Sequence, residues 1–498
     1  MDSSIPDDAR PSDIKGFCST FLRAKGTIQA LIISTLLSFA MGCTAGMVPE
    51  ILSDRYARLN HQYDGLPCFK FTHHTAPQAC LNGADDAQEA SAWGALLMNM
   101  LTLFFNPVMG SISDLHGRRM VLTVSIFLCT LAPIVLVVLQ IMPKLHPLWY
   151  YLASSIVGTI SYIGVMFAAL SDTIPEEFRA SSFALIMAGF YSGYALAPST
   201  ALLMDHFQVS VVSAVLAFAA FVFTLACFPE TLPESIAEVN QQHALEENEE
   251  ETNSNYWYLL RQVLTRPFRE AKILNQDVVI RLVAVGSFFS AMVYSTDISL
   301  VVFYIENHLN VRDGDIARMF LLMGVLGIMF QAVFLPILVK ILGEKGLLVT
   351  SFLSGTFHNF LYGVARDKRV IYVALAFSQL TKTNYPILSS LASKGASANE
   401  QGQVQGALFA SNALASAIGP LSMQYIYDHT ENTLGAGTMF LFASLLYLMG
   451  TVAVSFIPVE NNSDITSSEN DFFDSERNDI EEPLLLIQSS TQTDSNSK

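Results

Sequence analysis

The sequence predicts an all-α membrane protein in which twelve transmembrane helices form two bundles of six. Of its 498 residues, 51% are hydrophobic and only 14% are charged, and the mean hydropathy is +0.40. Soluble domains usually contain about 25% charged residues. Apolar stretches of about 20 residues recur along the chain, and each is long enough to cross about 30 Å of hydrocarbon. The charged residues gather instead at the two ends, in the 240s and in short turns.

The twelve expected spans fall into two groups that a polar segment separates. The first group is expected at 27–52, 91–113, 119–142, 147–171, 178–204 and 208–228. The second group is expected at 277–305, 315–341, 346–365, 369–391, 402–427 and 435–457. The chain then divides into an N-terminal tail (1–26), a six-helix bundle (27–228), a linker (229–276), a second six-helix bundle (277–457) and a disordered tail (458–498). No cleavable signal peptide is expected, because residues 1–24 are polar and the first apolar run is long enough to span.

The charge distribution predicts the orientation of the chain and excludes one class of partner. Lys and Arg residues are modestly more frequent in the loops on the side that holds both termini, which favours cytosolic termini. Much of the net charge of −17 comes from the segment around 244–251 and from the C-terminal tail. Such segments are typical of solvated or disordered chain, and nothing in the sequence points to nucleic-acid binding.

Cys68 and Cys80 lie in a long polar loop between the first two expected spans, on the non-cytosolic side. That side is oxidising in the secretory pathway, so these two cysteines are candidates for a local disulfide. His73 and His74 lie between them, and a metal site is the alternative. The disulfide is favoured because no further ligand pattern surrounds the two histidines. We therefore expect neither a metal nor a cofactor.

The stretch "GSISDLHGRRM" (110–120) joins two apolar spans and is the most informative turn in the chain. Gly110 permits close approach of a neighbouring helix, and Gly117 permits a tight backbone turn. Asp114 can pair with Arg118 and can also meet the positive N-terminus of another helix. With Arg119 at the interface, these residues are expected to form a latch, meaning a charge pair between bundles that breaks and reforms.

This pattern, G-x-x-x-D-x-x-G-R-R after the second of twelve helices, resembles the loop 2–3 signature of the major facilitator superfamily. The resemblance covers about residues 25–457. "SDTIPEEFRASSFA" (171–184) resembles the helix 4–5 turn of drug and tetracycline antiporters, and "PETLPES" (229–235) resembles a frequent turn after helix 6. Residues 385–420 resemble the helix 10–11 region of the tetracycline-resistance-like and hippocampus-abundant-transcript-like branches.

The resemblance implies a major facilitator fold and a secondary transporter, not an enzyme, that moves a small organic solute by alternating access. Transport would be proton-coupled, as in an antiporter or symporter, or facilitative. ATP drive is not expected, because the sequence contains no Walker A pattern G-x-x-x-x-G-K-[ST]. The alternative is a transporter-derived membrane receptor or scaffold that moves nothing. The latch argues against this alternative, because a static protein has no need of a breakable charge pair.

The two halves of the chain also echo each other, as the parallel repeats of this superfamily imply. An offset of 222 residues places Arg179 against Gln401. "PILVKILGEKG" (336–346) is a degenerate copy of the latch turn. In this copy Lys340 replaces the acidic residue, Glu344 replaces the first arginine, and Gly343 is kept.

Two departures from the family pattern narrow the expected activity. Helix 4 has Ser154 and Ser155 at about the place where drug antiporters of the superfamily carry an arginine. The glycine-rich motif of their helix 5 is thinned here to Gly189 and Gly193 before an Ala-Pro pair. Both changes argue against drug/proton antiport of that kind and leave the transporter interpretation intact.

Two ionisable residues at membrane depth are the main substrate or proton candidates, because such residues are energetically expensive in a bilayer. Asp297 lies in helix 7 and Lys382 in helix 10, and by the resemblance both helices line the central cavity. Either residue is expected to contact a polar or charged solute, or Asp297 carries a proton. The alternative is a structural ion pair between them. Pro386 should kink helix 10 and free a backbone carbonyl. Further candidates are Tyr294, Gln379, Asn384 and Thr44.

Several other residues have both a functional and a structural interpretation. Asn106, Tyr162, Tyr191 and Tyr194 either face the cavity or pack between helices, and packing is favoured. Asp172 and Arg179 frame the helix 4–5 turn, where they form either a gating pair or an interface anchor.

The C-terminal tail contains "EEPLLLI" (481–487), in which Glu481 precedes Leu485 and Leu486. This spacing resembles an acidic dileucine sorting signal that clathrin adaptors read, and chance occurrence in a disordered tail is the alternative. If the signal is used, it indicates an endosomal, lysosomal or vacuolar membrane; otherwise the plasma membrane is expected. The expected partners are therefore a small organic solute, the lipid bilayer, protons and clathrin adaptors.

Overall fold

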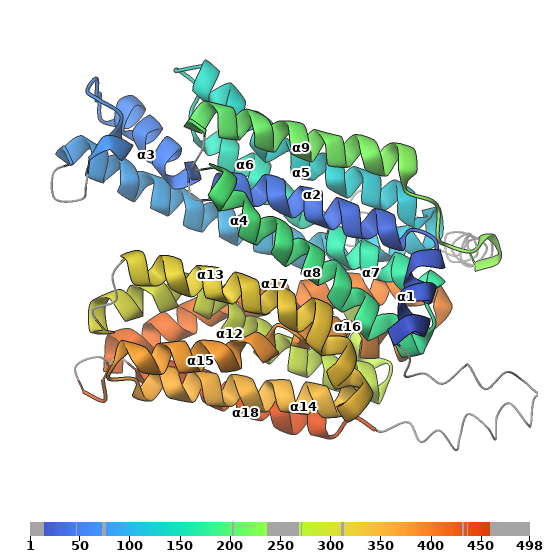
Figure 1. Ribbon diagram of the computed structural model, residues 1–498. Coiled ribbons are helices and arrows are strands. Elements are labelled where there is room, and N and C mark those ends of the chain that lie inside the picture. Colours follow the sequence, from blue (N-terminus) through green and yellow to red (C-terminus); the bar gives the residue numbers. More distant parts are fainter. Residues whose placement is uncertain are drawn as a thin grey trace, which may run out of the picture. The chain divides into compact units, whose positions relative to one another are not determined.

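Every regular element in the described part of the chain is a helix (Figure 1). The computed structural model describes residues 14–45, 47–71, 76–201, 204–236, 268–269, 271–309, 313–430, 433–435 and 437–458. Residues up to Phe456 form one unit, and a second unit begins at Ile457. His73, His74, most of the linker and the tail motif at Glu481, Leu485 and Leu486 lie outside the described residues.

The helices follow the expected spans in order, with different boundaries. The first part of the chain contains α1 (Ile14–Arg23), α2 (Thr27–Ala45), α3 (Met47–Asn60), α4 (Gln78–His116), α5 (Arg118–Ile141), α6 (Leu148–Ile156), α7 (Tyr162–Thr173), α8 (Glu176–Ala201) and α9 (His206–Cys227). The second part contains α12 (Val278–Leu309), α13 (Asp313–Met329), the π-helical turn η4 (Phe330–Phe334), α14 (Leu335–Val364), α15 (Lys368–Thr381), α16 (Asn384–Lys394), α17 (Gln401–Thr430) and α18 (Thr438–Ser455).

The composition of these helices makes this an integral membrane protein. Among the described residues, seven segments are long and apolar enough to cross a bilayer: α2, α4, α5, α6 with α7, α9, the first part of α12, and α18. Large apolar side chains along them remain exposed, including Val215 at 60% and Val452 at 54%. In water such surfaces would be unfavourable, and in a bilayer they face lipid.

The expected first span, 27–52, is wrong as a single helix. α2 ends at Ala45 and α3 begins at Met47. Pro49 is the physical reason, because a proline ring collides with the carbonyl four residues earlier, which is that of Ala45.

The expected fourth span, 147–171, is also two helices. A short 3-10 turn at 157–159 and extended residues at Ile160 and Ser161 separate α6 from α7. The Ser161 hydroxyl caps α7 by accepting a hydrogen bond from the Gly164 amide at 3.1 Å. Asn106 of α4 bridges the break, donating to the Gly158 carbonyl and accepting from the Ser161 amide, both at 2.7 Å. Asn106 therefore serves helix packing rather than an open cavity.

The polar loop expected between the first two spans is mostly helical, which corrects its interpretation as an irregular loop. α4 has 39 residues, so it is about 58 Å long at ~1.5 Å per residue, and the hydrocarbon layer is about 30 Å thick. Its first turns therefore extend beyond the bilayer and pack against α3 (Figure 1). Gly83 makes this contact close, because a Cβ there would lie 2.6 Å from the Ala57 amide nitrogen. Hydropathy missed this part of α4 because it is rich in Ala, Asp, Glu and Gln.

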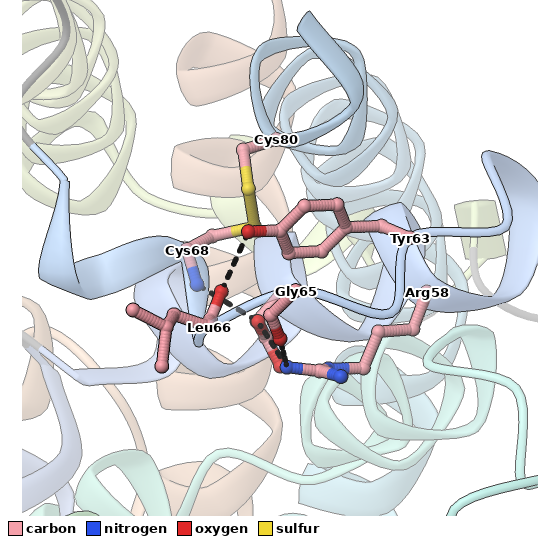
Figure 2. Close-up of a disulfide and its surroundings, with 7 residues drawn as sticks. Arg58, Tyr63, Gly65, Leu66, Cys68 and Cys80 are labelled. Atoms are coloured by element: carbon pink, nitrogen blue, oxygen red, sulfur yellow. Dashed lines mark hydrogen bonds and ion pairs between the residues drawn. A yellow bond between two sulfur atoms is a disulfide. The ribbon is translucent and has the colours of Figure 1, made fainter. Parts of the chain in front are cut away.

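Cys68 and Cys80 are joined by a disulfide at the start of α4, with their Cα atoms 5.5 Å apart (Figure 2). Side chains of α3 hold the chain that leads to it. Asp54 accepts a hydrogen bond from the Cys68 amide at 2.8 Å, and Arg58 donates to the Gly65 carbonyl at 3.1 Å. The hydrogen bond between Arg58 and Asp54 raises the pKa of the Arg58 guanidinium. We call this end of α4 the disulfide end and the end at residues 110–119 the latch end.

Helices that lie far apart in the sequence form the largest contacts. α4 packs along α17, and α8 packs against α2, α13 and α16. Within the second part of the chain, α12 packs against α17 and α18, and α14 packs against α15 and α18. The contacts of α4 and α8 with α13, α16 and α17 therefore join the two sequence halves and position the residues described next.

Candidate functional site

Asp114 binds the N-terminus of a helix from the other half of the chain. Its carboxylate accepts hydrogen bonds from the backbone amides of Gly402 and Gln403, each at 2.8 Å. These residues lie in the first turn of α17, where amides lack intrahelical partners and the helix dipole is positive. A buried carboxylate at this place satisfies two such amides and is itself stabilised by the dipole.

Arg118 joins Asp114 to a second carboxylate. The guanidinium is fully buried and forms ion pairs with Asp114 and with Asp172, the latter at 2.8 Å between Nε and Oδ2. It also donates to the Ser113 hydroxyl at 2.7 Å. Gly117, at φ +98°, makes the turn that brings Arg118 back over the end of α4. One arginine therefore ties the ends of α4 and α7 to the carboxylate that caps α17.

Glu230 completes this cluster, although its place in the sequence does not mark it as a partner. Its carboxylate accepts from the backbone amides of Arg118 at 2.9 Å and Arg119 at 3.1 Å, which are the first amides of α5. The Arg119 side chain is exposed and donates to the Leu225 carbonyl at 2.6 Å. The "PETLPES" turn was noticed only as a family resemblance. An acidic residue placed to cap a neighbouring helix has no local sequence signal.

The backbones of α4 and α17 approach each other at glycines. A Cβ on Gly110 would collide with the carbonyl of Gly402, and a Cβ on Gly402 would lie 2.6 Å from Arg118 Nη1. One turn further along, a Cβ on Gly406 would collide with the carbonyl of Asn106. Only small residues allow the two helices to come this close. The glycines therefore permit the hydrogen bonds of Asp114 to form.

Arg179 lies in a second polar cluster at the same end of the chain. It donates to the Ser171 carbonyl at 3.0 Å and to the Ser393 carbonyl at 3.2 Å, so it also joins the two sequence halves. The hydroxyls of Ser171 and Ser393 lie 2.7 Å apart, and Gln401 donates to the Ser393 carbonyl at 3.0 Å. Asp172 and Arg179 are not paired with each other in the described structure, since Asp172 binds Arg118 and Arg179 lies 3.8 Å from Glu176. Their expected gating pair is therefore two separate contacts.

Lys382 lies at a break in the expected tenth span, 369–391, which is α15 and α16 rather than one helix. Pro386 explains the break, because its ring excludes the carbonyl of Lys382 from a helical hydrogen bond. That carbonyl instead accepts a hydrogen bond from the side-chain amide of Gln331 at 2.6 Å. The Lys382 ammonium donates to the Met323 carbonyl at 2.9 Å and lies 5.3 Å from the centre of the Tyr191 ring.

Tyr191, over which the Lys382 ammonium lies, belongs to a group of three tyrosines from both sequence halves. Tyr191 and Tyr194 belong to α8, and Tyr294 belongs to α12. Tyr294 lies within electrostatic range of Tyr191, Tyr194 and Asp297. Its side chain is 50% exposed although it lies in the middle of α12, and Tyr194 is 44% exposed. The arrangement offers a cation and phenol hydroxyls to a solute.

The remaining candidates are buried polar groups with different roles. Gln379 is buried, and its side-chain oxygen has no hydrogen-bond partner among the described residues. Asn384 is held by Ser351 and by Ser290, the latter at 3.3 Å. The Thr44 hydroxyl donates at 3.2 Å to the Met41 carbonyl of its own helix.

Asp297 does not pair with Lys382 within the described part of the chain. Its partner is His358 of α14, with 3.7 Å between Oδ2 and the ring Nε2. The His358 ring is buried, whereas the Asp297 side chain is 24% exposed. The alternative of a structural Asp297–Lys382 ion pair is therefore wrong. His358 was missed in the sequence, although a histidine at membrane depth is itself a signal.

Comparisons with known proteins agree with this architecture. The family model of the Major Facilitator Superfamily matches residues 30–420. Hippocampus abundant transcript 1 protein of Mus musculus is 23% identical over 399 residues, covering 74% of this chain and 77% of that protein. The class D tetracycline resistance protein of Salmonella ordonez is 24% identical over 370 residues, covering 73% of this chain and 86% of that protein.

The fold is also that of a solved structure. The crystal structure of the human organic anion transporter MFSD10 (TETRAN) has a TM-score of 0.68 and 19% identity, covering 86% of this chain and 98% of that one. The expected membership of the major facilitator superfamily is thus confirmed, as is the resemblance to its tetracycline-resistance-like and hippocampus-abundant-transcript-like branch. MFSD10 is described as a transporter. This chain belongs to the major facilitator superfamily.

Proposed function

We propose that this protein is a secondary active transporter that moves a small organic solute by alternating access. Its twelve spans would form two six-helix bundles, 27–228 and 277–457, joined by a cytosolic linker at 229–276. The observation that carries this proposal is the binding of Asp114 to the α17 amides, which lie 288 and 289 positions later in the chain. Such a contact closes the latch end and can open without loss of either bundle.

The latch consists of a small number of strong hydrogen bonds. Asp114 is held by two backbone amides and by Arg118, and each charge-assisted hydrogen bond contributes about 1.5–3 kcal/mol. Arg118 and Asp172 stay together when α17 leaves, so the arginine is never left without a partner. The state closed at the latch end is then favoured by an amount that solute binding can overcome.

The solute is proposed to be an organic anion that the Lys382 ammonium recognises. No carboxylate lies within ion-pair distance of Lys382 among the described residues, and its ammonium contacts only a carbonyl and an aromatic ring. Asp297, the nearby acid, is turned to His358 instead. An uncompensated cation at membrane depth favours an anionic ligand. MFSD10, which shares this fold and is described as an organic anion transporter, agrees with this choice.

A binding test separates this proposal from its alternatives. Purified full-length protein is screened for thermal stabilisation against aromatic carboxylates and sulfonates, neutral isosteres and organic cations. A ligand at 100 times its dissociation constant stabilises by about 2.7 kcal/mol. We expect stabilisation by anions only, lost in Lys382→Gln and kept in Lys340→Gln, whose side chain is exposed. Equal stabilisation of the Lys382→Gln variant, or stabilisation by cations alone, would contradict the anion site.

Uptake then distinguishes a transporter from a receptor or scaffold. The anion that binds most tightly is offered to proteoliposomes that contain the protein. Accumulation above that of empty liposomes is expected for a transporter. Binding without accumulation, under a proton gradient of either direction, would favour a transporter-derived receptor. In the same measurement, uptake that depends on the proton gradient would indicate coupling to protons. Uptake that does not depend on it would indicate facilitated movement.

The cellular membrane is proposed from the tail. Glu481, Leu485 and Leu486, outside the described residues, would direct the protein through clathrin adaptors to an endosomal, lysosomal or vacuolar membrane, with both termini cytosolic. Replacing both leucines by alanine should move a tagged protein to the plasma membrane. An unchanged location would mean that the motif occurs by chance.

A further inference from the structure

Asp297 and His358 lie together at membrane depth although 61 positions separate them in the sequence. Asp297 belongs to α12 and His358 to α14, and Nε2 of the imidazole lies 3.7 Å from Oδ2 of the carboxylate. The other ring nitrogen of His358, Nδ1, lies 2.9 Å from the Ala374 carbonyl of α15. A carbonyl only accepts hydrogen bonds, so Nδ1 must carry a hydrogen.

This tautomer decides what Nε2 presents to Asp297. In a neutral imidazole with a hydrogen on Nδ1, Nε2 is an acceptor. An ionised Asp297 is also an acceptor, so the two groups would face each other with lone pairs and no hydrogen between them. One added proton removes this conflict. It makes either an imidazolium beside a carboxylate or a carboxylic acid that donates to Nε2.

The charged groups seen around the pair are few. Among the described residues, the phenols of Tyr294 on α12, Tyr362 on α14 and Tyr447 on α18 lie within electrostatic range of Asp297. No ammonium or guanidinium forms an ion pair with it in the described part of the chain. The second carboxylate oxygen, Oδ1, is buried without a hydrogen-bond partner among the described residues.

The two members of the pair differ in how exposed they are. The His358 side chain is 4% exposed, and its ring packs against Tyr362 with centroids 4.3 Å apart. The Asp297 side chain is 24% exposed and lies one helical turn from the half-exposed Tyr294. A proton can therefore reach the pair through Asp297. The 3.7 Å separation is longer than a direct hydrogen bond, which leaves room for the pair to tighten as it gains the proton.

We infer that Asp297 and His358 form a shared-proton site that binds one proton reversibly. The proton is taken up on Asp297 or on Nε2 of His358, and its release restores the carboxylate and the neutral imidazole. The role of this site in coupling rests on the proposed transport function. The existence of the site does not, because proton binding is measured without any solute.

The direct test is NMR of the full-length protein in lipid nanodiscs, with histidine labelled by the NMR-active nitrogen isotope. The His358 signals are identified by their loss in His358→Gln. We expect the Nδ1–H tautomer whenever the ring is neutral, and a pH titration of His358 that differs between the wild type and Asp297→Asn. Asp297→Glu, which keeps a carboxylate, should retain a titration close to that of the wild type.

A second His–Asp pair in the chain supplies the matched control. His61 and Asp86 lie 3.1 Å apart near the disulfide end, outside the membrane-spanning part. Asp86→Asn should alter the His61 signals and leave those of His358 unchanged. Unchanged signals of the other histidines in Asp297→Asn show that the variant is folded. If a folded Asp297→Asn left the His358 titration unchanged, or if His358 carried its hydrogen on Nε2, the shared-proton site would be overturned.

Transport of the organic-anion probe selected in the binding test gives a second readout. We expect Asp297→Asn to bind the probe and to lose the pH dependence of its uptake. A wild-type pH profile in this variant would reject Asp297 as the proton carrier. Failure of every probe to bind the wild-type protein would count against the proposed function alone, since the NMR titration does not depend on it.

Discussion

Glu344 and Lys394 form in the second half of the chain the ion pair that Arg118 and Asp172 form in the first, with the charges exchanged. Lys394 Nζ lies 3.1 Å from Glu344 Oε1. Lys394 follows Asp172 by 222 positions, the same separation as between the two serines whose hydroxyls meet at the latch end. Gly343, at φ +67°, precedes Glu344 as Gly117 precedes Arg118. The second copy of the repeat therefore keeps the geometry of this ion pair and exchanges the charges of its two members.

This inversion predicts that an exchange of charges is tolerated. Glu344→Lys or Lys394→Glu alone places like charges together in a mostly buried site, and we expect a loss of about 1–3 kcal/mol in stability. The double variant should recover most of this loss, because attraction is restored. Thermal unfolding in detergent measures the effect. A double variant as unstable as either single variant would mean that other contacts of these residues dominate.

Asp114→Asn should weaken closure of the latch end without preventing membrane insertion. The variant removes the charge that holds Arg118 and the α17 N-terminus, so the closed state should lose about 1–3 kcal/mol, or about 5–150-fold in population. The population is read with Ser393→Cys, a buried position in the interface, in a background where the exposed Cys18 and Cys227 are serines. Faster labelling by an impermeant thiol reagent and slower uptake are expected.

The matched control for Asp114 is a helix-capping aspartate that joins nothing across the halves. Asp367 caps α15 by accepting from the Arg369 amide at 2.8 Å, close to it in the sequence. Asp367→Asn should leave labelling and uptake unchanged. Wild-type uptake and labelling rates in Asp114→Asn would remove the basis for the latch.

Gly110→Ala should destabilise the closed state through a steric effect alone. The added methyl group would meet the backbone carbonyl of Gly402, which cannot turn aside as a side chain can. Elsewhere in a helix this substitution adds about 1 kcal/mol of helix propensity. Gly346→Ala is the control, because its nearest contact would be an ordinary 3.4 Å to Leu342. Opposite signs of the change in melting temperature are expected, and equal signs would contradict the close contact.

Removing the disulfide should lower stability at the disulfide end. The bond closes a loop with a sequence separation of 12, and a loop of similar size contributes about 3 kcal/mol by restricting the unfolded chain. Cys68→Ser with Cys80→Ser should therefore melt at a lower temperature than the wild type. A reductant should lower the melting temperature of the wild type and leave that of the double variant unchanged. If the reductant lowered the melting temperature of both proteins equally, its effect would not come from this disulfide.

Local chemistry explains which features could be predicted. The latch turn was identifiable because Asp114, Gly117 and Arg118 lie within a few residues of each other. The break at Lys382 was predictable from Pro386, since a proline excludes one known carbonyl. The helical start of α4 was not predicted, because a polar helix outside the bilayer has no hydropathy signal. Glu230 and Gln331 could not be identified as partners, because they meet their targets 112 and 51 positions away.

By itself the sequence determined that this is a helical membrane protein of the major facilitator superfamily, and which turn and which two charged residues deserve functional tests. Hydrophobic length, charge placement and proline act over a few residues, so they can be read along the chain. Only the tertiary structure decided the partners. It turned Asp297 toward His358, left Lys382 beside Tyr191, and set Asp114 on the N-terminus of α17. These contacts depend on the rotation and depth of each helix, which packing between distant segments determines.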